Sequence, residues 1–229
     1  MSTLHEDTCP SDPTTHSPGG LTVGKYHGLG NDFLVAIDPA VGLDAAAARR
    51  LCDRHIGIGA DGLIESRSGP EGAALTFRLW NADGSEAEMS GNGMRCLAHA
   101  ALDAGLVEVG VPFAVATPAG VKEVLIERAD ATVWSRVEMG PAVVEGEADR
   151  CNVGHGQLYV DVGNPHLVIA GADPATVDVA ALGPALSASS PEGLNVEFAT
   201  LGPGPDEVTM RVWERGVGET QACGTGSCA

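Results

Sequence analysis

Apolar positions recur along this chain in short clusters separated by turn residues. Residues 22–37 hold two such clusters, around Tyr26 and around Phe33, on either side of the Gly-Leu-Gly-Asn sequence at 28–31. This pattern predicts two strands joined by a turn. Alternating or clustered apolar positions predict further strands at 75–80, 111–116, 121–127 and 132–138.

Two stretches have the composition of helices. Asp44 precedes an alanine-rich run that extends to Arg54, and an aspartate in that position predicts a helix N-cap. The run from Met94 to Asp103 follows Gly93, and Gly105 is placed to end it. The chain therefore predicts a mixed fold in which strands precede a Gly-x-Gly loop that opens a helix.

The chain also matches itself at one offset. Gly30–Val35 matches Gly163–Val168, and Trp80–Gly93 matches Trp213–Gly226; 163 minus 30 and 213 minus 80 both give 133. Gly-Asn and Gly-x-Gly are common sequences, but two separate stretches that share one offset favour duplication over chance. We expect two similar halves related by a pseudo-twofold axis, with Ser90 and Cys223 facing each other across a central cleft.

The duplication predicts the organisation of the chain. We expect a flexible N-terminal extension at 1–20, a first half-domain at 21–118 and a second at 119–229. The fold class is then α+β, with each half a curved sheet around a helix and the site in the cleft between them. In the first half a helix and strands follow the Gly-x-Gly loop, whereas the second half ends at Ala229. By that template we expect that on the order of 30 to 60 residues of the second half are absent from this sequence.

Composition narrows the classes of function. The 229 residues are 44% hydrophobic, as in a soluble globular protein, and 31 acidic against 13 basic residues give a net charge of −18. This charge argues against a nucleic-acid or anionic-membrane partner and leaves a small zwitterionic ligand open. Neither a signal peptide nor a membrane anchor is recognisable, so we expect a cytoplasmic protein whose six cysteines are mostly thiols.

The residues before the two Gly-x-Gly loops suggest the chemistry. A thiol or hydroxyl at a helix start lies where backbone N–H groups and the helix dipole favour negative charge. This position is expected to lower the pKa of Cys223 toward neutrality and to bind a substrate carboxylate. Two such residues on opposite sides of one carbon atom are suited to inverting a stereocentre, because one removes a proton while the other delivers one.

Other residues in or near the repeated segments fit this chemistry. His166 and Glu214 are placed to take or share a proton with a neighbouring side chain. Arg215 offers a fork for a carboxylate. Neutral hydrogen-bonding amides are supplied by Asn31, Asn81, Asn92, Asn164 and Asn195.

Metal binding is the weaker interpretation of the cysteines. Cys223 and Cys228 have C-x4-C spacing without a second pair, so we predict no metal site. Cys52, Cys96 and Cys151 are expected to act as small buried hydrophobic residues.

With these motifs in place, a family resemblance becomes specific. HGLGNDF at 27–33, NADGSEAEMSGNGMRC at 81–96, GNPH at 163–166 and ERGVGETQACGTGS at 214–227 resemble diaminopimelate epimerase. The resemblance covers about residues 22–229. It implies inversion of one α-carbon of LL-diaminopimelate to the meso form, without pyridoxal phosphate or another cofactor and without metal, in a homodimer.

The resemblance also implies roles for individual residues. Cys223 is one acid/base, Ser90 stands at the place of the other, and His166 and Glu214 assist. Substrate contacts are implied for Asn31, Asn81, Gly91, Asn92, Asn164, Asn195, Glu214, Arg215, Gly224 and Thr225.

Ser90 departs from the family pattern, which has cysteine directly before Gly-Asn-Gly. Cys96 lies too far along the helix to replace it, and a family position often held by Gln is Gly62 here. Because an alcohol is a far weaker acid than a thiol, Ser90 is expected to slow inversion. Two alternatives remain: an epimerase for another amino acid, as in the proline racemase group, although Asn92 disfavours it, and a non-catalytic amino-acid-binding protein.

Overall fold

The computed structural model describes residues 20–147 and 156–229. The first half begins with a five-stranded sheet in the order β1-β2-β3-β5-β6. Its strands are β1 (Gly24–Gly28), β2 (Asn31–Ile37), β3 (Gly62–Ser66), β5 (Arg78–Asn81) and β6 (Glu86–Ala87). Helix α1 (Ala45–Cys52) begins where Asp44 accepts a hydrogen bond from the Ala47 N–H, and it packs on β3 and β5.

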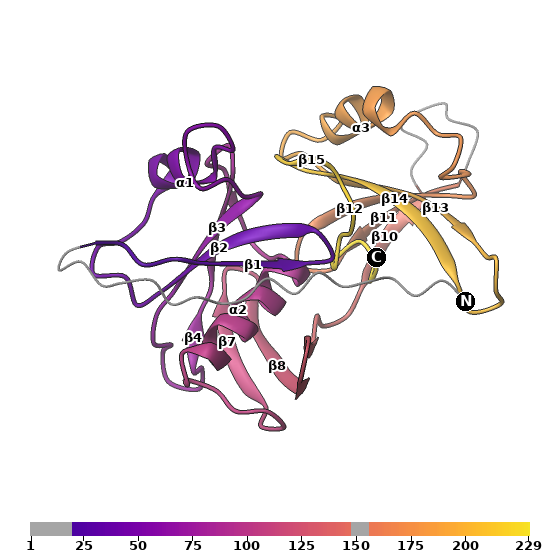
Figure 1. Ribbon diagram of the computed structural model, residues 1–229. Helices are drawn as coiled ribbons and strands as arrows, with labels where there is room; N and C mark the ends of the chain where they lie inside the picture. Colours follow the sequence, from indigo (N-terminus) through magenta and orange to yellow (C-terminus); the bar gives the residue numbers. More distant parts are fainter. Residues whose placement is uncertain (1–19, 148–155) are drawn as a thin grey trace.

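A second sheet completes the first half and encloses a helix. The order of this sheet is β4-β7-β8-β9, with β4 (Leu75–Thr76), β7 (Phe113–Thr117), β8 (Gly120–Ala129) and β9 (Val133–Val137). Helix α2 (Gly91–Asp103) contacts strands of both sheets (Figure 1). Its apolar face, with Met94 and Leu97, shares one core with Phe77, Val115 and Ile126. The core therefore fixes the start of α2 against both sheets.

The second half is built on a six-stranded sheet in the order β10-β11-β12-β13-β14-β15. Its strands are β10 (Val143–Glu147), β11 (Gly156–Asp161), β12 (Pro165–Ala170), β13 (Asn195–Leu201), β14 (Val208–Glu214) and β15 (Gly218–Thr220). Helix α3 (Val179–Ser187) packs on β13, β14 and β15 and closes a core that contains Leu167, Leu186 and Phe198. Figure 1 shows this half in orange and yellow beside the indigo and magenta first half.

The pairing of the strands confirms the duplication. In both halves the successive pairs are antiparallel, parallel, antiparallel and antiparallel, along β1-β2-β3-β5-β6 and along β11-β12-β13-β14-β15. The register keeps the offset seen in the sequence. Phe33 pairs with Gly62 and His166 pairs with Asn195, while Leu63 pairs with Trp80 and Val196 pairs with Trp213. The two sheets are therefore copies of one unit.

Several predicted elements differ in detail. The strand predicted at 75–80 is two strands that belong to different sheets, because the chain crosses from one sheet to the other at Phe77, whose side chain is buried. The first helix ends at Cys52 rather than at Arg54, and α2 begins at Gly91, before Met94. The strands predicted at 111–116, 121–127 and 132–138 are present as β7, β8 and β9.

Sheet membership also bears on the domain boundary. The predicted boundary after residue 118 falls in the turn between Thr117 and Gly120, which pair as the ends of β7 and β8. Because β7, β8 and β9 share their core with α2, we propose that the first half extends through Val137. The predicted extension at 1–20 lies outside the described residues except for Gly20. None of the helices in the described part of the chain has the length and apolar character needed to cross a membrane.

Candidate functional site

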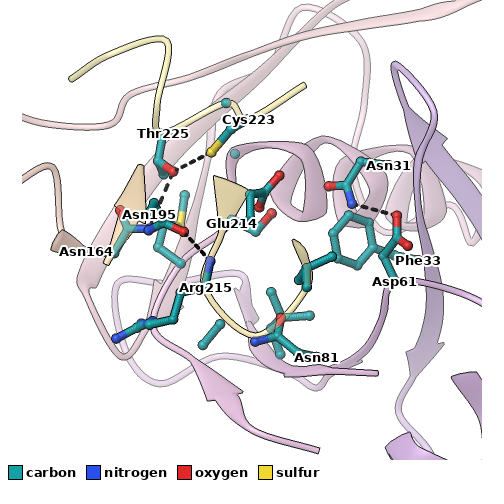
Figure 2. Close-up of a pocket in the computed structure, with 17 residues that line it drawn as sticks. Asn31, Phe33, Asp61, Asn81, Asn164, Asn195, Glu214, Arg215, Cys223 and Thr225 are labelled. Atoms are coloured by element: carbon teal, nitrogen blue, oxygen red, sulfur yellow. Dashed lines mark hydrogen bonds between the residues drawn. The ribbon is translucent and has the colours of Figure 1, made fainter. Parts of the chain in front are cut away.

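A pocket lies between the two halves and takes its walls from both. Figure 2 shows Asn31, Asp61 and Asn81 of the first half opposite Asn164, Asn195 and Cys223 of the second. The lining residues are Asn31, Phe33, Asp61, Leu79, Asn81, Ala87, Met89, Ser90, Gly91, Asn164, Asn195, Glu214, Arg215, Val217, Cys223, Gly224 and Thr225.

Ser90 enters this pocket as the N-cap of α2. Its backbone is extended, with φ −145° and ψ 121°, and its hydroxyl oxygen accepts the Gly93 N–H at 3.0 Å. An N-cap side chain satisfies one of the backbone donors that a helix start leaves unpaired. Ser90 therefore both stabilises α2 and presents a hydroxyl to the pocket.

Cys223 occupies the equivalent position of the second half. Residues 223–229 form a helical turn, in which the Ser227 N–H donates to the Cys223 carbonyl and the Ala229 N–H donates to the Thr225 carbonyl. The Gly226 N–H donates to Cys223 Sγ at 3.3 Å. This contact matches the one between Gly93 and Ser90, so residues 90 and 223 have the same local setting.

Gly91 and Gly224 hold the two loops in contact. A β-carbon at Gly91 would lie 3.0 Å from Gly224 Cα, and one at Gly224 would lie 2.9 Å from Gly91 Cα. Such distances are too short for a real side chain. Because the two glycines are equivalent in the repeat, the pseudo-twofold axis passes between them. Ser90 and Cys223 therefore enter the pocket from loops that meet at this axis.

Cys223 does not have the low pKa expected of a residue at a helix start. Burial, together with the negative charges of Glu214 and Glu197, raises the pKa of this thiol to about 12. Hydrogen bonds from Thr225 and Gly226 act in the opposite direction but are outweighed. The expectation of a pKa near neutrality is therefore wrong for this structure, in which Cys223 is a thiol.

Glu214 is the second perturbed group in the pocket. Burial, together with the negative charges of Glu197 and Asp61, raises the pKa of its carboxyl to about 7. A hydrogen bond from Thr220 and the neighbouring His166 oppose this shift. Glu214 therefore titrates close to neutral pH beside a thiol whose charge it influences.

A chain of hydrogen bonds connects Cys223 to buried groups beneath the pocket. Cys223 Sγ lies 3.2 Å from Thr225 Oγ1, which accepts a hydrogen bond from Asn164 Nδ2 at 3.4 Å. Asn164 Oδ1 lies 3.0 Å from His166 Nε2, and His166 Nδ1 lies 2.7 Å from Glu197 Oε1. Figure 2 shows the outer part of this chain, from Asn164 through Thr225 to Cys223. His166 thus lies behind the pocket wall, not within the pocket.

The first half lacks this polar support. The residues equivalent to His166 and Glu197 are Phe33 and Ile64, both buried in the apolar core. A β-carbon at Gly93 would lie 3.3 Å from Ile64 Cδ1, and one at Gly226 would lie 2.5 Å from Glu197 Oε1, so Ile64 and Glu197 occupy corresponding places. The scaffold is therefore symmetric, whereas the surroundings of Ser90 and Cys223 are not.

The predicted amides lie on several walls. Asn31 Nδ2 donates to Asp61 at 2.8 Å, and Asn81 Nδ2 donates to Ser85 at 3.0 Å. Asn195 Oδ1 accepts the backbone N–H of Arg215 at 3.0 Å, which fixes the turn that carries Arg215 (Figure 2).

The pocket brings together most of the predicted site residues. Two do not line it: His166 is fully buried, and Asn92 is buried where its Nδ2 donates to Asn31 and to the Ala222 carbonyl. Asp61 and Met89 line the pocket without having been predicted, as do Phe33, Leu79, Ala87 and Val217. Of these, Phe33 could have been found from the repeat, because it is the equivalent of His166.

Other predictions concern the remaining cysteines and metals. Cys52 and Cys96 are buried thiols as predicted, while Cys9 and Cys151 lie outside the described residues. Within the ranges 20–147 and 156–229, no group of three or more His, Cys, Asp or Glu side chains is arranged to hold a metal ion.

Two copies of one α+β unit, with a hydroxyl and a thiol at equivalent loops around a shared pocket, define the class of duplicated amino-acid racemases and epimerases. The family model described as diaminopimelate epimerase matches residues 23–145 and 158–229. The chain belongs to the diaminopimelate epimerase family and is an isomerase of the cofactor-independent type.

Individual relatives agree with this assignment. A diaminopimelate epimerase of Microcystis aeruginosa is 38% identical over 231 residues, which cover 90% of this chain and 80% of the relative. One of Heliobacterium modesticaldum is 43% identical over 230 residues, with the same coverage. Among solved structures, a hydroxyproline epimerase of Agrobacterium vitis has the same fold, with a TM-score of 0.64 at 17% identity over 90% of this chain and 73% of that one.

Proposed function

We propose that this protein interconverts LL-diaminopimelate and meso-diaminopimelate by proton transfer at one α-carbon, with Cys223 and Ser90 on opposite faces. The observation that carries this proposal is that residues 90 and 223, equivalent in the two halves, line one pocket from loops that touch at the pseudo-twofold axis. An inversion needs one proton-handling group on each face of the reacting carbon.

Substrate binding prepares the site for this step. The start of α2 and the turn at 223–229 offer backbone N–H groups to the α-carboxylate. The α-ammonium adds a positive charge next to Glu214, which lowers the pKa values of the Glu214 carboxyl and the Cys223 thiol. Cys223 thus gives its proton to solvent and becomes a thiolate when the cationic substrate is bound.

The proton transfers follow from these positions. The Cys223 thiolate takes the α-proton and becomes a thiol, and the electron pair left on the α-carbon is stabilised through the bound carboxylate. Ser90 then gives its hydroxyl proton to the other face, and solvent returns both side chains to their starting states. Because an alkoxide is unfavourable at neutral pH, the step at Ser90 limits the rate of inversion.

The other pocket residues hold the ligand in this proposal. Asn31, Asn81, Asn164 and Asn195 offer amides to both ends of the substrate, together with Gly91, Gly224 and Thr225 at the two loops, while the buried Asn92 supports Asn31 through the hydrogen bond from its Nδ2. Arg215 binds the distal carboxylate and Glu214 the ammonium. His166 supports Cys223 through Asn164 and Thr225. We further propose that the protein acts in lysine and peptidoglycan precursor synthesis, lies in the cytoplasm and forms a homodimer.

Exchange and inversion in heavy water test the proposal. With LL-diaminopimelate in D2O, we expect deuterium to enter the α-carbon faster than the meso form appears, because Cys223 works faster than Ser90. The S90C variant should speed inversion by about tenfold or more, since a thiol replaces an alcohol. Cys223→Ala should abolish exchange, whereas Cys228→Ala, which removes an exposed thiol five residues on, should not.

The same assay decides between the alternatives. Deuterium in another amino acid, but not in diaminopimelate, would assign the protein to a different substrate. Measurable binding of diaminopimelate without exchange would show that the protein binds this amino acid but does not catalyse its epimerisation. Equal rates of exchange and inversion in the unmodified protein, or no gain from S90C, would contradict the role of Ser90.

A further inference from the structure

An ion pair joins Arg215, which lines the pocket, to Glu88 and so links the two halves. Arg215 follows β14 in the second half, and its Nη2 lies 2.5 Å from Oε2 of Glu88 in the first half. Glu88 lies between β6 and α2, two residues before Ser90, and it is about half exposed. The two residues are 127 positions apart in the chain.

The stem of Arg215 is held on its own side of the pocket. Its Nη1 donates to the Glu192 carbonyl at 3.1 Å, and its Cγ and Cδ lie where a β-carbon of Gly193 would be 2.9 to 3.0 Å away. The end of the side chain therefore has little freedom to leave the pocket, whereas Glu88 is on the exposed side and is free to turn outward.

The charges of the pocket make this guanidinium important. Among the residues that line the described pocket, Arg215 is the one with a basic side chain, and the acidic ones are Asp61 and Glu214. The Asp61 carboxylate is already paired with Arg54 and accepts a hydrogen bond from Asn31. A second carboxylate on a ligand therefore has Arg215 as its cationic partner. In this structure the Glu88 carboxylate is already paired with Arg215.

We propose that Glu88 is a specificity-determining residue, whose carboxylate occupies Arg215 until a ligand with a carboxylate at its far end replaces it. A ligand with a neutral far end does not replace Glu88, because it offers no charge in exchange for the ion pair. Glu88 thereby makes binding depend on the second carboxylate. This inference deepens the proposed function and rests on Arg215 facing the far end of the substrate.

Binding of substrate-length acids tests the inference without turnover. Pimelate carries two carboxylates on a seven-carbon chain, and heptanoate carries one. Calorimetric dissociation constants of both acids are measured for the unmodified protein, Glu88→Gln and Glu86→Gln. Glu86 is the matched control because it pairs with Arg78 on the same segment, away from the pocket.

Glu88→Gln should bind pimelate about two- to fivefold more tightly, the range that removal of one partly exposed competing ion pair gives. Its affinity for heptanoate should be unchanged, and Glu86→Gln should match the unmodified protein with both acids. Weaker or unchanged pimelate binding by Glu88→Gln overturns the inference, since Glu88 would then support Arg215 or have no part in binding. The inference is also overturned if neither the unmodified protein nor Glu88→Gln shows saturable binding of pimelate. Failure of the proposed function is read separately, from deuterium exchange into diaminopimelate.

Discussion

Glu214 links the chemistry of the pocket to the stability of the fold. Its pKa is raised from 4.5 to about 7, chiefly by burial. A carboxyl whose folded pKa is raised contributes its full stabilisation below pH 4.5, and this contribution is lost as the pH rises through 7. Burial therefore gives Glu214 a pKa near neutrality, and it also makes the folded protein less stable at higher pH.

Glu214→Gln should remove this pH dependence. The variant should gain stability over the unmodified protein between pH 5 and 8, by up to about 3 kcal/mol, because the amide has no charge to bury. Urea unfolding at a series of pH values measures the difference, with the exposed Glu71→Gln as control. A difference that stays constant with pH would show that Glu214 is not the titrating group.

Single residues also mark the limit of inference from sequence. Cys223 and Ser90 could be found because the repeat aligns them, but the raised pKa of Cys223 could not. It depends on burial and on Glu197, which comes from a distant strand. The burial of His166, in contrast, could be inferred from the repeat, since its equivalent Phe33 belongs to an apolar cluster of a predicted strand.

At the scale of elements, α1, α2 and α3 all begin with side-chain caps of the same kind, that of α3 being Asp178. Asp44 caps α1 and Ser90 caps α2, each through a side-chain oxygen that accepts the N–H three residues on. Only the second cap lies in the pocket. Comparing Asp44 with Ser90 therefore distinguishes the structural role of an N-cap from a role in catalysis.

Asp44→Ala and Ser90→Ala should each lower the free energy of unfolding by about 1 kcal/mol, the usual cost of losing an N-cap. Inversion should disappear only in Ser90→Ala, which retains deuterium exchange through Cys223. Denaturant unfolding and the exchange assay together measure both effects. Loss of inversion in Asp44→Ala would mean that helix stability, rather than the hydroxyl, controls the rate.

The elements differ in how far the sequence predicts them. Alternating apolar positions predicted β7, β8 and β9, and the repeat implied that the second sheet would copy the first. Strand β3 was missed, because all five of its residues are buried and no alternation marks it. The break at Phe77 was missed for a related reason: alternation is the same on both sides, and only tertiary packing assigns the two parts to different sheets.

For the molecule as a whole, the contact between Gly91 and Gly224 sets the spacing of the halves. Gly91→Ala should lower activity on the order of a hundredfold, because its β-carbon pushes the two loops apart and misplaces residues 90 and 223. Gly42→Ala is the control, since a β-carbon there meets no atom within 4 Å. Rates of exchange and inversion for both variants test this, and normal activity in Gly91→Ala would show that the loops tolerate separation.

The serine at position 90 also determines how the protein responds to oxidation. Cys223 is the one cysteine among the residues lining the described pocket. An oxidant that converts its sulfur to a sulfenic acid finds no neighbouring thiol there to close a disulfide across the cleft. The two halves consequently stay unlinked, and the sulfenic acid is restored by a small external thiol that enters the pocket.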